Sequence, residues 1–138
     1  MFSASAARAY ADVGLETGVT SANPHRLIVM LYDGAIEAIG DARTHVANGA
    51  QNAKASAISR AIGIIEQGLR SSLDLSRGES IARQLDELYD YMARRLLVAS
   101  LRSDAAALAE VAALLTDLRS AWHAIAGNKA VKETRHAA

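Results

Sequence analysis

Apolar residues recur every three or four positions in four long segments of the chain, at 24–46, 52–75, 80–101 and 103–127. This spacing is typical of amphipathic helices, each of which buries one stripe of side chains. The segments have about 22 to 24 residues each and short connections, so consecutive helices must double back on one another. The pattern therefore predicts an all-α fold, an antiparallel up-down-up-down four-helix bundle.

The ends of these segments carry residues that start or stop helices. In Asn23-Pro24 the asparagine can cap free amides while the proline occupies the first turn, and Asn48-Gly49 offers a left-handed residue that ends the first helix. Ser80 is a candidate cap for the third helix, and either residue of Ser103-Asp104 can cap the fourth. We expect the fourth helix to end at Gly127-Asn128.

Residues before the bundle have a weaker pattern. Apolar positions in 1–22 share one helical face, but Gly14 and Gly18 interrupt it, which predicts a short helix on a mobile arm. The sequence thus divides into an N-terminal arm (1–22), the bundle (23–127) and a short polar C-terminal tail that we expect to be frayed (128–138).

Each predicted helix supplies one apolar stripe to a common core. The stripes contain Leu27, Ile28, Leu31, Tyr32, Ala35, Ala38, Ile39, Ala42 and Val46; Ile58, Ala61, Ile62, Ile65, Leu69 and Leu73; Ile81, Leu85, Leu88, Tyr89, Met92, Leu96 and Ala99; and Leu108, Val111, Leu115, Leu118 and Trp122. These side chains are enough to fill the interior of a four-helix bundle.

Further apolar residues fall outside those stripes. They are Val29, Ile36, Ile64, Leu75, Tyr91, Leu97, Val98, Leu101, Leu114 and Ile125. Single exposed apolar residues are ordinary in soluble proteins, but a partner covering half a dozen of them would gain on the order of 10 kcal/mol before ordering costs. The leftover residues therefore predict a bundle with surface grooves for apolar helices.

Four glycines lie inside the predicted helices, at Gly34, Gly40, Gly63 and Gly68. Each costs about 1 kcal/mol relative to alanine in a helix interior. We interpret them as positions where neighbouring helices pack closely.

Composition and charge exclude several classes of function. The 138 residues include 15 basic and 15 acidic side chains, and the sequence pI is near 6.9, so the charge footprint of a nucleic-acid-binding or lipid-surface protein is missing. The chain has no cysteine, which excludes disulfides and thiolate chemistry. We expect neither a secretory signal nor a membrane-spanning helix, because the richest apolar stretch, 105–118, is interrupted by Glu110 and Asp117.

The usual constellations of catalysis and metal binding are missing from the sequence. A di-iron bundle needs two Glu-x-x-His pairs, whereas the nearest arrangement here is Asp41 with His45, four residues apart and without a counterpart on a second helix. The sequence has no Gly-rich phosphate loop, nucleophile elbow or His-Asp-Ser set. We therefore expect no enzyme, no catalytic residue, no metal and no cofactor.

Over nearly its whole length the chain resembles the FliS family of flagellin export chaperones. The matching residues are Ala9-Tyr10, Asn23-Pro24-His25-Arg26-Leu27, Met30-Leu31-Tyr32-Asp33-Gly34-Ala35, Ile62 through Leu69, Leu85 through Leu96, Glu110-Val111, and Leu118 through Trp122. One departure lies before the third helix, where the family often has Gly-Gly and this chain has Gly78-Glu79.

The resemblance implies a helical bundle of the bacterial cytoplasm that holds the otherwise disordered C-terminal segment of flagellin and prevents premature polymerisation. It implies delivery to the flagellar type III export gate, with Tyr10 in the docking role. By the same resemblance, two groups of residues would border grooves for the client. They are Leu27, Ile28 and Leu31 on the first helix, and Tyr91, Leu97 and Leu101 on the third.

Helix-in-groove recognition coupled to client folding is the mechanism that we expect. The alternative is a self-associating structural bundle without a client, in which the side stripes form a homodimer interface. The sequence leaves open whether the free protein is a monomer or a weak homodimer, and whether a co-chaperone or flagellar regulator shares the surface.

Overall fold

The structure is a computed structural model that describes residues 24–75 and 80–137, with side chains described through Ile125. It is all-helical over this part of the chain, with α3 (Pro24–Ala47), α4 (Gln51–Gly63), α5 (Ser80–Arg102) and α6 (Ala105–Ala137). A π-helical segment, η1 (Ile64–Leu69), and a 3-10 turn, η2 (Arg70–Ser72), continue α4. The predicted N-terminal arm, including Tyr10, lies outside the described residues.

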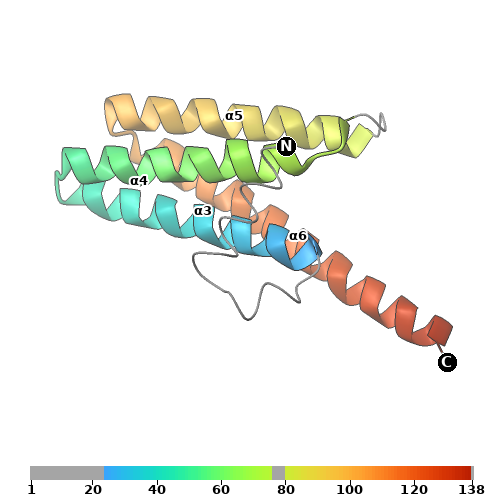
Figure 1. Ribbon diagram of the computed structural model, residues 1–138. Helices are drawn as coiled ribbons and strands as arrows, with labels where there is room; N and C mark the ends of the chain where they lie inside the picture. The colour runs from blue at the N-terminus through green and yellow to red at the C-terminus, as the bar shows by residue number, and fades with distance from the viewer. Residues whose placement is uncertain (1–23, 76–79, 138) are drawn as a thin grey trace.

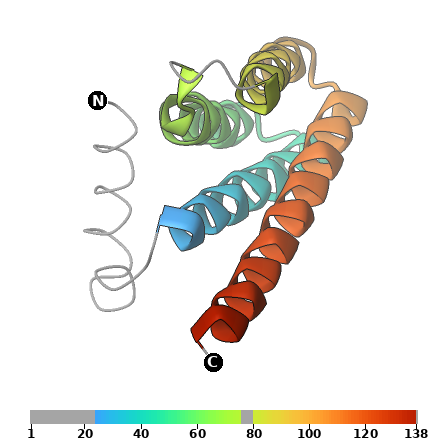
Figure 2. The same ribbon diagram turned by 90° about the vertical axis from the view of Figure 1, so that its right-hand side faces the viewer.

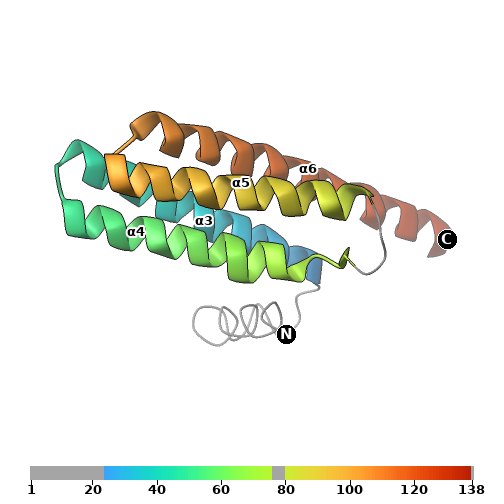
Figure 3. The ribbon, with the colours of Figure 1, turned by 90° about the horizontal axis from the view of Figure 1, so that it is seen from above.

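Each long helix runs back along its predecessor, so the chain forms an antiparallel bundle (Figures 1 and 3). α3 packs against α4 and α6, and α5 packs against the same two helices, which places α3 and α5 at diagonal positions. The predicted fold class is confirmed.

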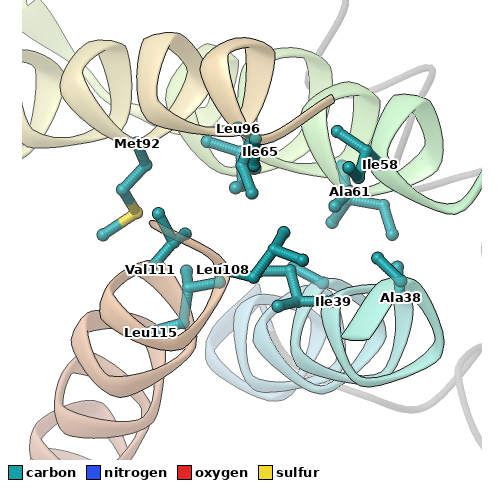
Figure 4. Close-up of a cluster of buried hydrophobic side chains, with 14 of the residues drawn as sticks. Ala38, Ile39, Ile58, Ala61, Ile65, Met92, Leu96, Leu108, Val111 and Leu115 are labelled. Carbon is teal, nitrogen blue, oxygen red and sulfur yellow. The ribbon is translucent and has the colours of Figure 1, made fainter. Parts of the chain in front are cut away.

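The core comes from the predicted stripes of all four long helices. Figure 4 shows side chains of this core converging in the bundle interior, among them Ile39 from α3, Ile65 from η1, Leu96 from α5 and Leu108 from α6. Each of these four side chains is fully buried. The helical spacing therefore identified the centre of the bundle correctly.

The structure corrects two core assignments. Ile81, which we expected in the core, is 58% exposed, because it lies in the first turn of α5 at an end of the bundle where none of the described helices covers it. Ile64, which we placed outside the stripe, is buried with 7% exposed. It lies seven residues after Ala57, which is 3% exposed, so both fall on one side of the helix, and the buried face there is wider than the stripe that we assigned.

The second helix ends earlier than predicted, and the fourth ends later. Leu73 is already extended, with φ −72° and ψ 138°, because the hydroxyls of Ser71 and Ser72 donate to the carbonyls of Glu66 and Leu69 and replace helical donors. α6 continues past the expected stop at Gly127-Asn128 to Ala137 and projects beyond the other helices (Figure 1). Good helix formers after the glycine outweigh its cost of about 1 kcal/mol.

The bundle is closed at the end that holds the α3–α4 and α5–α6 turns. Gly49 has φ 69°, as its predicted role in ending α3 requires. Asp104 caps α6, since its Oδ1 accepts from the amide of Ala107 at 3.2 Å, which confirms one of the two predicted caps. Lys54, only 4% exposed, donates to Gln51 Oε1 at 2.7 Å and to Ser103 Oγ at 2.8 Å, and so joins the two turns.

Only one of the three helix glycines whose surroundings are defined is in close contact. A Cβ on Gly68 would lie 2.9 Å from Leu31 Cδ2, so η1 and α3 pack closely there, as predicted. A Cβ on Gly40 or on Gly63 would meet nothing within 4 Å, so the same prediction is wrong for these two positions.

We expect Gly40→Ala to raise the free energy of unfolding by about 0.5–1 kcal/mol, because the alanine restricts the unfolded chain and finds open space in α3. Gly68→Ala gives no such gain, since its Cβ displaces the buried side chain of Leu31. Urea unfolding of the two variants measures the difference. Equal stabilisation by both alanines would contradict the close approach at Gly68.

Candidate apolar cleft

An apolar cleft of about 650 Å³ lies at the end of the bundle opposite the two closed turns. Figure 2 looks toward this end, where α3 and α5 begin and where η1 and η2 continue α4. Every long helix except α4 lines the cleft directly, and η1, η2 and the following residues supply the fourth wall. The lining residues are Pro24, His25, Leu27, Ile28, Leu31, Tyr32, Gly68, Ser72, Leu73, Asp74, Ile81, Ala82, Leu85, Tyr89, Trp122 and Ile125.

The rim of this end cleft exposes large apolar side chains. Ile81 on α5 is 58% exposed and Ile125 on α6 is 53% exposed. Covering such groups removes apolar surface from water, at about 25 cal/mol per Å². The rim is therefore suited to an apolar partner.

One wall of the end cleft is held by a reciprocal contact between α3 and α6. His25 Nε2 lies 2.7 Å from the carbonyl oxygen of Trp122, and Trp122 Nε1 donates to the carbonyl oxygen of His25 at 3.2 Å. The two rings stack with centroids 4.9 Å apart and an interplanar angle of 14°. An ion pair between Arg119 and Asp33 joins the same two helices, about one turn before Trp122 on α6 and about two turns after His25 on α3.

The floor of the end cleft is formed by two tyrosines on the diagonal helices. The hydroxyls of Tyr32 on α3 and Tyr89 on α5 are hydrogen-bonded at 2.5 Å, and the two residues are 1% and 2% exposed. Burial raises the pKa of both hydroxyls above the ordinary value of 10, so both remain neutral at physiological pH. The Tyr32–Tyr89 hydrogen bond therefore connects α3 and α5 at the boundary between the packed core and the cleft.

The wall at η1 and η2 is fixed to α5 by one arginine. Arg70 donates to Asp86 at 2.7 Å, to Glu66 at 3.1 Å and to Asp90 at 3.2 Å. The hydrogen bond to Asp86 is the main cause of the raised pKa of Arg70, so the guanidinium stays charged. These charge-assisted bonds hold the irregular end of the second helix beside the cleft.

The six predicted client residues do not form one surface. Leu27, Ile28 and Leu31 line the end cleft, although Leu31 is only 2% exposed and belongs to the core. Leu97 and Leu101 on α5 are 53% and 84% exposed, and we call this pair the α5 patch.

Tyr91 belongs to neither surface. Its hydroxyl donates to Glu110 of α6 at 2.5 Å, and Arg95 donates to the same carboxylate at 2.8 Å. Because Tyr91 and Leu97 are six residues apart, they lie about 120° apart around α5. The structure therefore separates Tyr91 from the α5 patch, with which we had grouped it.

Sequence reasoning missed several lining residues of the end cleft. Leu73, Ile81, Leu85, Tyr89 and Trp122 were assigned to the core, and Ile125 was noted as leftover without a role. Leu73 and Ile81 lie on either side of the connection between the second and third helices, whereas Tyr89 lies in the middle of α5 and Trp122 and Ile125 in the middle of α6. Helical periodicity placed five of the six on core faces and gave no signal of where the neighbouring helices end.

The described residues give no indication of metal chemistry or membrane insertion. They contain no group of three or more His, Asp or Glu side chains placed to hold a metal ion. Asp41, the nearest metal candidate in the sequence, instead accepts from Arg60 at 2.8 Å. None of the described helices is long and apolar enough to cross a membrane.

A helical bundle with an apolar cleft at one end defines a class of helical binding proteins. Within that class, the model of the family FliS, described as "Flagellar protein FliS", matches residues 6–129 of the chain. The chain therefore belongs to the FliS family, which confirms the resemblance drawn from its motifs.

Curated relatives agree with this assignment. The chain is 48% identical over 135 residues to the flagellar secretion chaperone FliS of Salmonella typhimurium, covering 98% of this chain and 100% of the relative. It is 42% identical to FliSB of Pseudomonas aeruginosa, covering 91% and 98%, and 33% identical to FliS of Bacillus subtilis, covering 78% of each. The chain is thus an export chaperone of flagellar secretion and not an enzyme.

Proposed function

We propose that this protein binds the C-terminal disordered segment of flagellin in the bacterial cytoplasm, prevents its premature polymerisation and assists its delivery to the flagellar export gate. The observation that carries the proposal is the end cleft, whose rim leaves Ile81 and Ile125 more than half exposed. An amphipathic segment that folds on binding would cover these side chains with its own apolar stripe.

The α5 patch offers a second contact for the same segment. Leu101 is 84% exposed, and Leu97, one turn before it, is 53% exposed. Because the patch and the end cleft are at different places on the bundle, a client touching both has to wrap around α5 rather than insert at one point. The predicted role of Tyr10 in docking to the export gate lies outside the described residues and stays a prediction.

The competing function is self-association, with the α5 patch as the interface between two copies. Self-association is supported by the exposure of Leu97 and Leu101, which also supports client binding. The two functions differ in the oligomeric state that they predict for the protein without its client. A coordinated substitution, Leu97→Asp with Leu101→Asp, removes the patch without touching the packed core.

Sedimentation of the purified protein distinguishes these functions. We expect a monomer alone and a 1:1 complex with a peptide of roughly 40 residues from the flagellin C-terminus, long enough for two helices. The doubly substituted protein should remain a folded monomer and lose affinity for the peptide by at least about tenfold, the value of one covered leucine. An unsubstituted dimer that ignores the peptide, and becomes monomeric on substitution, would favour self-association instead.

A further inference from the structure

The hydroxyl pair on the cleft floor carries one hydrogen more than the pair itself uses. One of the two hydroxyls of Tyr32 and Tyr89 donates to the other across 2.5 Å, which leaves the hydrogen of the accepting hydroxyl for another acceptor. We propose that this second hydrogen is a specificity element, which selects a cleft occupant that presents one uncharged oxygen acceptor at the inner end of an otherwise apolar surface. The inference deepens the proposed function and rests on it.

The other polar side chains that line the end cleft are engaged or cannot donate. Ser72 Oγ donates to the carbonyl of Leu69 at 2.6 Å, and His25 Nε2 lies 2.7 Å from the carbonyl oxygen of Trp122. Asp74 is an acceptor when ionised. Among the lining side chains, the tyrosine pair therefore keeps a donor hydrogen for an occupant.

The location of the pair makes this donor selective. Both tyrosines line the end cleft and are almost fully buried, so an acceptor that reaches them leaves water and enters apolar surroundings. In such surroundings a hydrogen bond that is made is strong, and a donor covered without an acceptor is costly. Because burial raises the pKa of both hydroxyls, the pair keeps both hydrogens throughout the physiological range of pH.

The acceptor must be an oxygen that a helical occupant leaves free. Carbonyls inside a helix accept from the amide four residues later, whereas side-chain oxygens and the carbonyls of the last turn remain available. A carboxylate would have to give up its hydration next to apolar walls, and the lining contains no lysine or arginine to pair with it. The chemistry thus favours Asn, Gln, Ser or Thr, or the carbonyl end of a helix.

The test is a double substitution, Tyr32→Phe with Tyr89→Phe, titrated with the flagellin C-terminal peptide. Removing both hydroxyls leaves neither one orphaned, so urea unfolding should show a bundle of nearly unchanged stability. Trp122 is the single tryptophan of the chain and lines the end cleft, so its fluorescence reports occupancy. We expect the double variant to bind about tenfold more weakly, the value of one buried hydrogen bond.

A peptide series identifies the acceptor, with each Asn, Gln, Ser and Thr replaced in turn by alanine. A side-chain acceptor is shown by one replacement that weakens binding to the unsubstituted protein but not to the double variant. A last-turn carbonyl is indicated when the double variant binds weakly and no replacement is coupled to it.

Equal affinity of the double variant and the unsubstituted protein, within about twofold, would overturn this inference and leave the proposed function standing. Failure of the unsubstituted protein to bind the peptide at all would instead overturn the proposed function, and this inference with it.

Discussion

Ile81→Asp is expected to weaken binding of the flagellin C-terminal segment by at least about tenfold, with the helix content unchanged. Covering an isoleucine contributes about 1.5–3 kcal/mol, and a carboxylate in its place must lose hydration beneath an apolar occupant. The fold should tolerate the change because Ile81 is 58% exposed and lies in the first turn of α5, where an acidic side chain is favourable. Calorimetric titration measures the affinity, and circular dichroism checks the fold.

A matched control carries the same charge elsewhere on the bundle. Ser59 is exposed on α4 and lines no part of the end cleft, so Ser59→Asp should leave the affinity within about twofold. Ile125→Asp, on the α6 side of the rim, should weaken binding as Ile81→Asp does. Similar affinities for the Ile81 and Ser59 variants would show that the client binds elsewhere.

Leu108→Ala is expected to lower the free energy of unfolding by about 2–5 kcal/mol. Leu108 is fully buried and lies among side chains from the other helices, including Ile39, in the bundle centre (Figure 4). The truncation leaves a cavity that the surrounding helices cannot close without moving.

Urea unfolding measures this loss, with Leu101→Ala as the control of identical chemistry. Leu101 is 84% exposed, so its truncation should change the stability by no more than about 0.5 kcal/mol. A loss at Leu108 as small as the loss at Leu101 would mean that α6 is not packed into the core as the structure has it.

The fold could be predicted because its signals are local. Helical spacing identified the faces that meet in the core, where Ile39, Leu96 and Leu108 are fully buried. The cap at Asp104 and the left-handed Gly49 follow from the chemistry of single residues. Because the connections between the long helices are short, consecutive helices must pack antiparallel, which predicts the bundle.

The end cleft could not be predicted with the same success, because periodicity gives the face of a residue and not what covers it. Ile81 and Leu96 belong to one stripe of α5, yet the first is 58% exposed and the second is fully buried. The difference depends on where the neighbouring helices end. The second helix ends at Ser72, earlier than its apolar pattern suggests, because serine hydroxyls bond its carbonyls.

The tyrosine pair and the separation of Tyr91 from the α5 patch also depend on how side chains are arranged in space. Tyr32 and Tyr89 are 57 positions apart, and nothing in the sequence pairs them. The grouping of Tyr91 with Leu97 and Leu101 came from the family resemblance and ignored their angles around α5. The structure separates them because Tyr91 faces Glu110 of α6.

Calorimetric titration with the flagellin C-terminal segment, together with circular dichroism of the mixture, tests the central claim most directly. A client that folds on an apolar cleft should bind 1:1, with a negative heat-capacity change, modest salt dependence and more helix than the sum of the separate components. Absence of both heat and helix gain, with the bundle itself shown to be folded, would contradict the claim that this cleft binds flagellin.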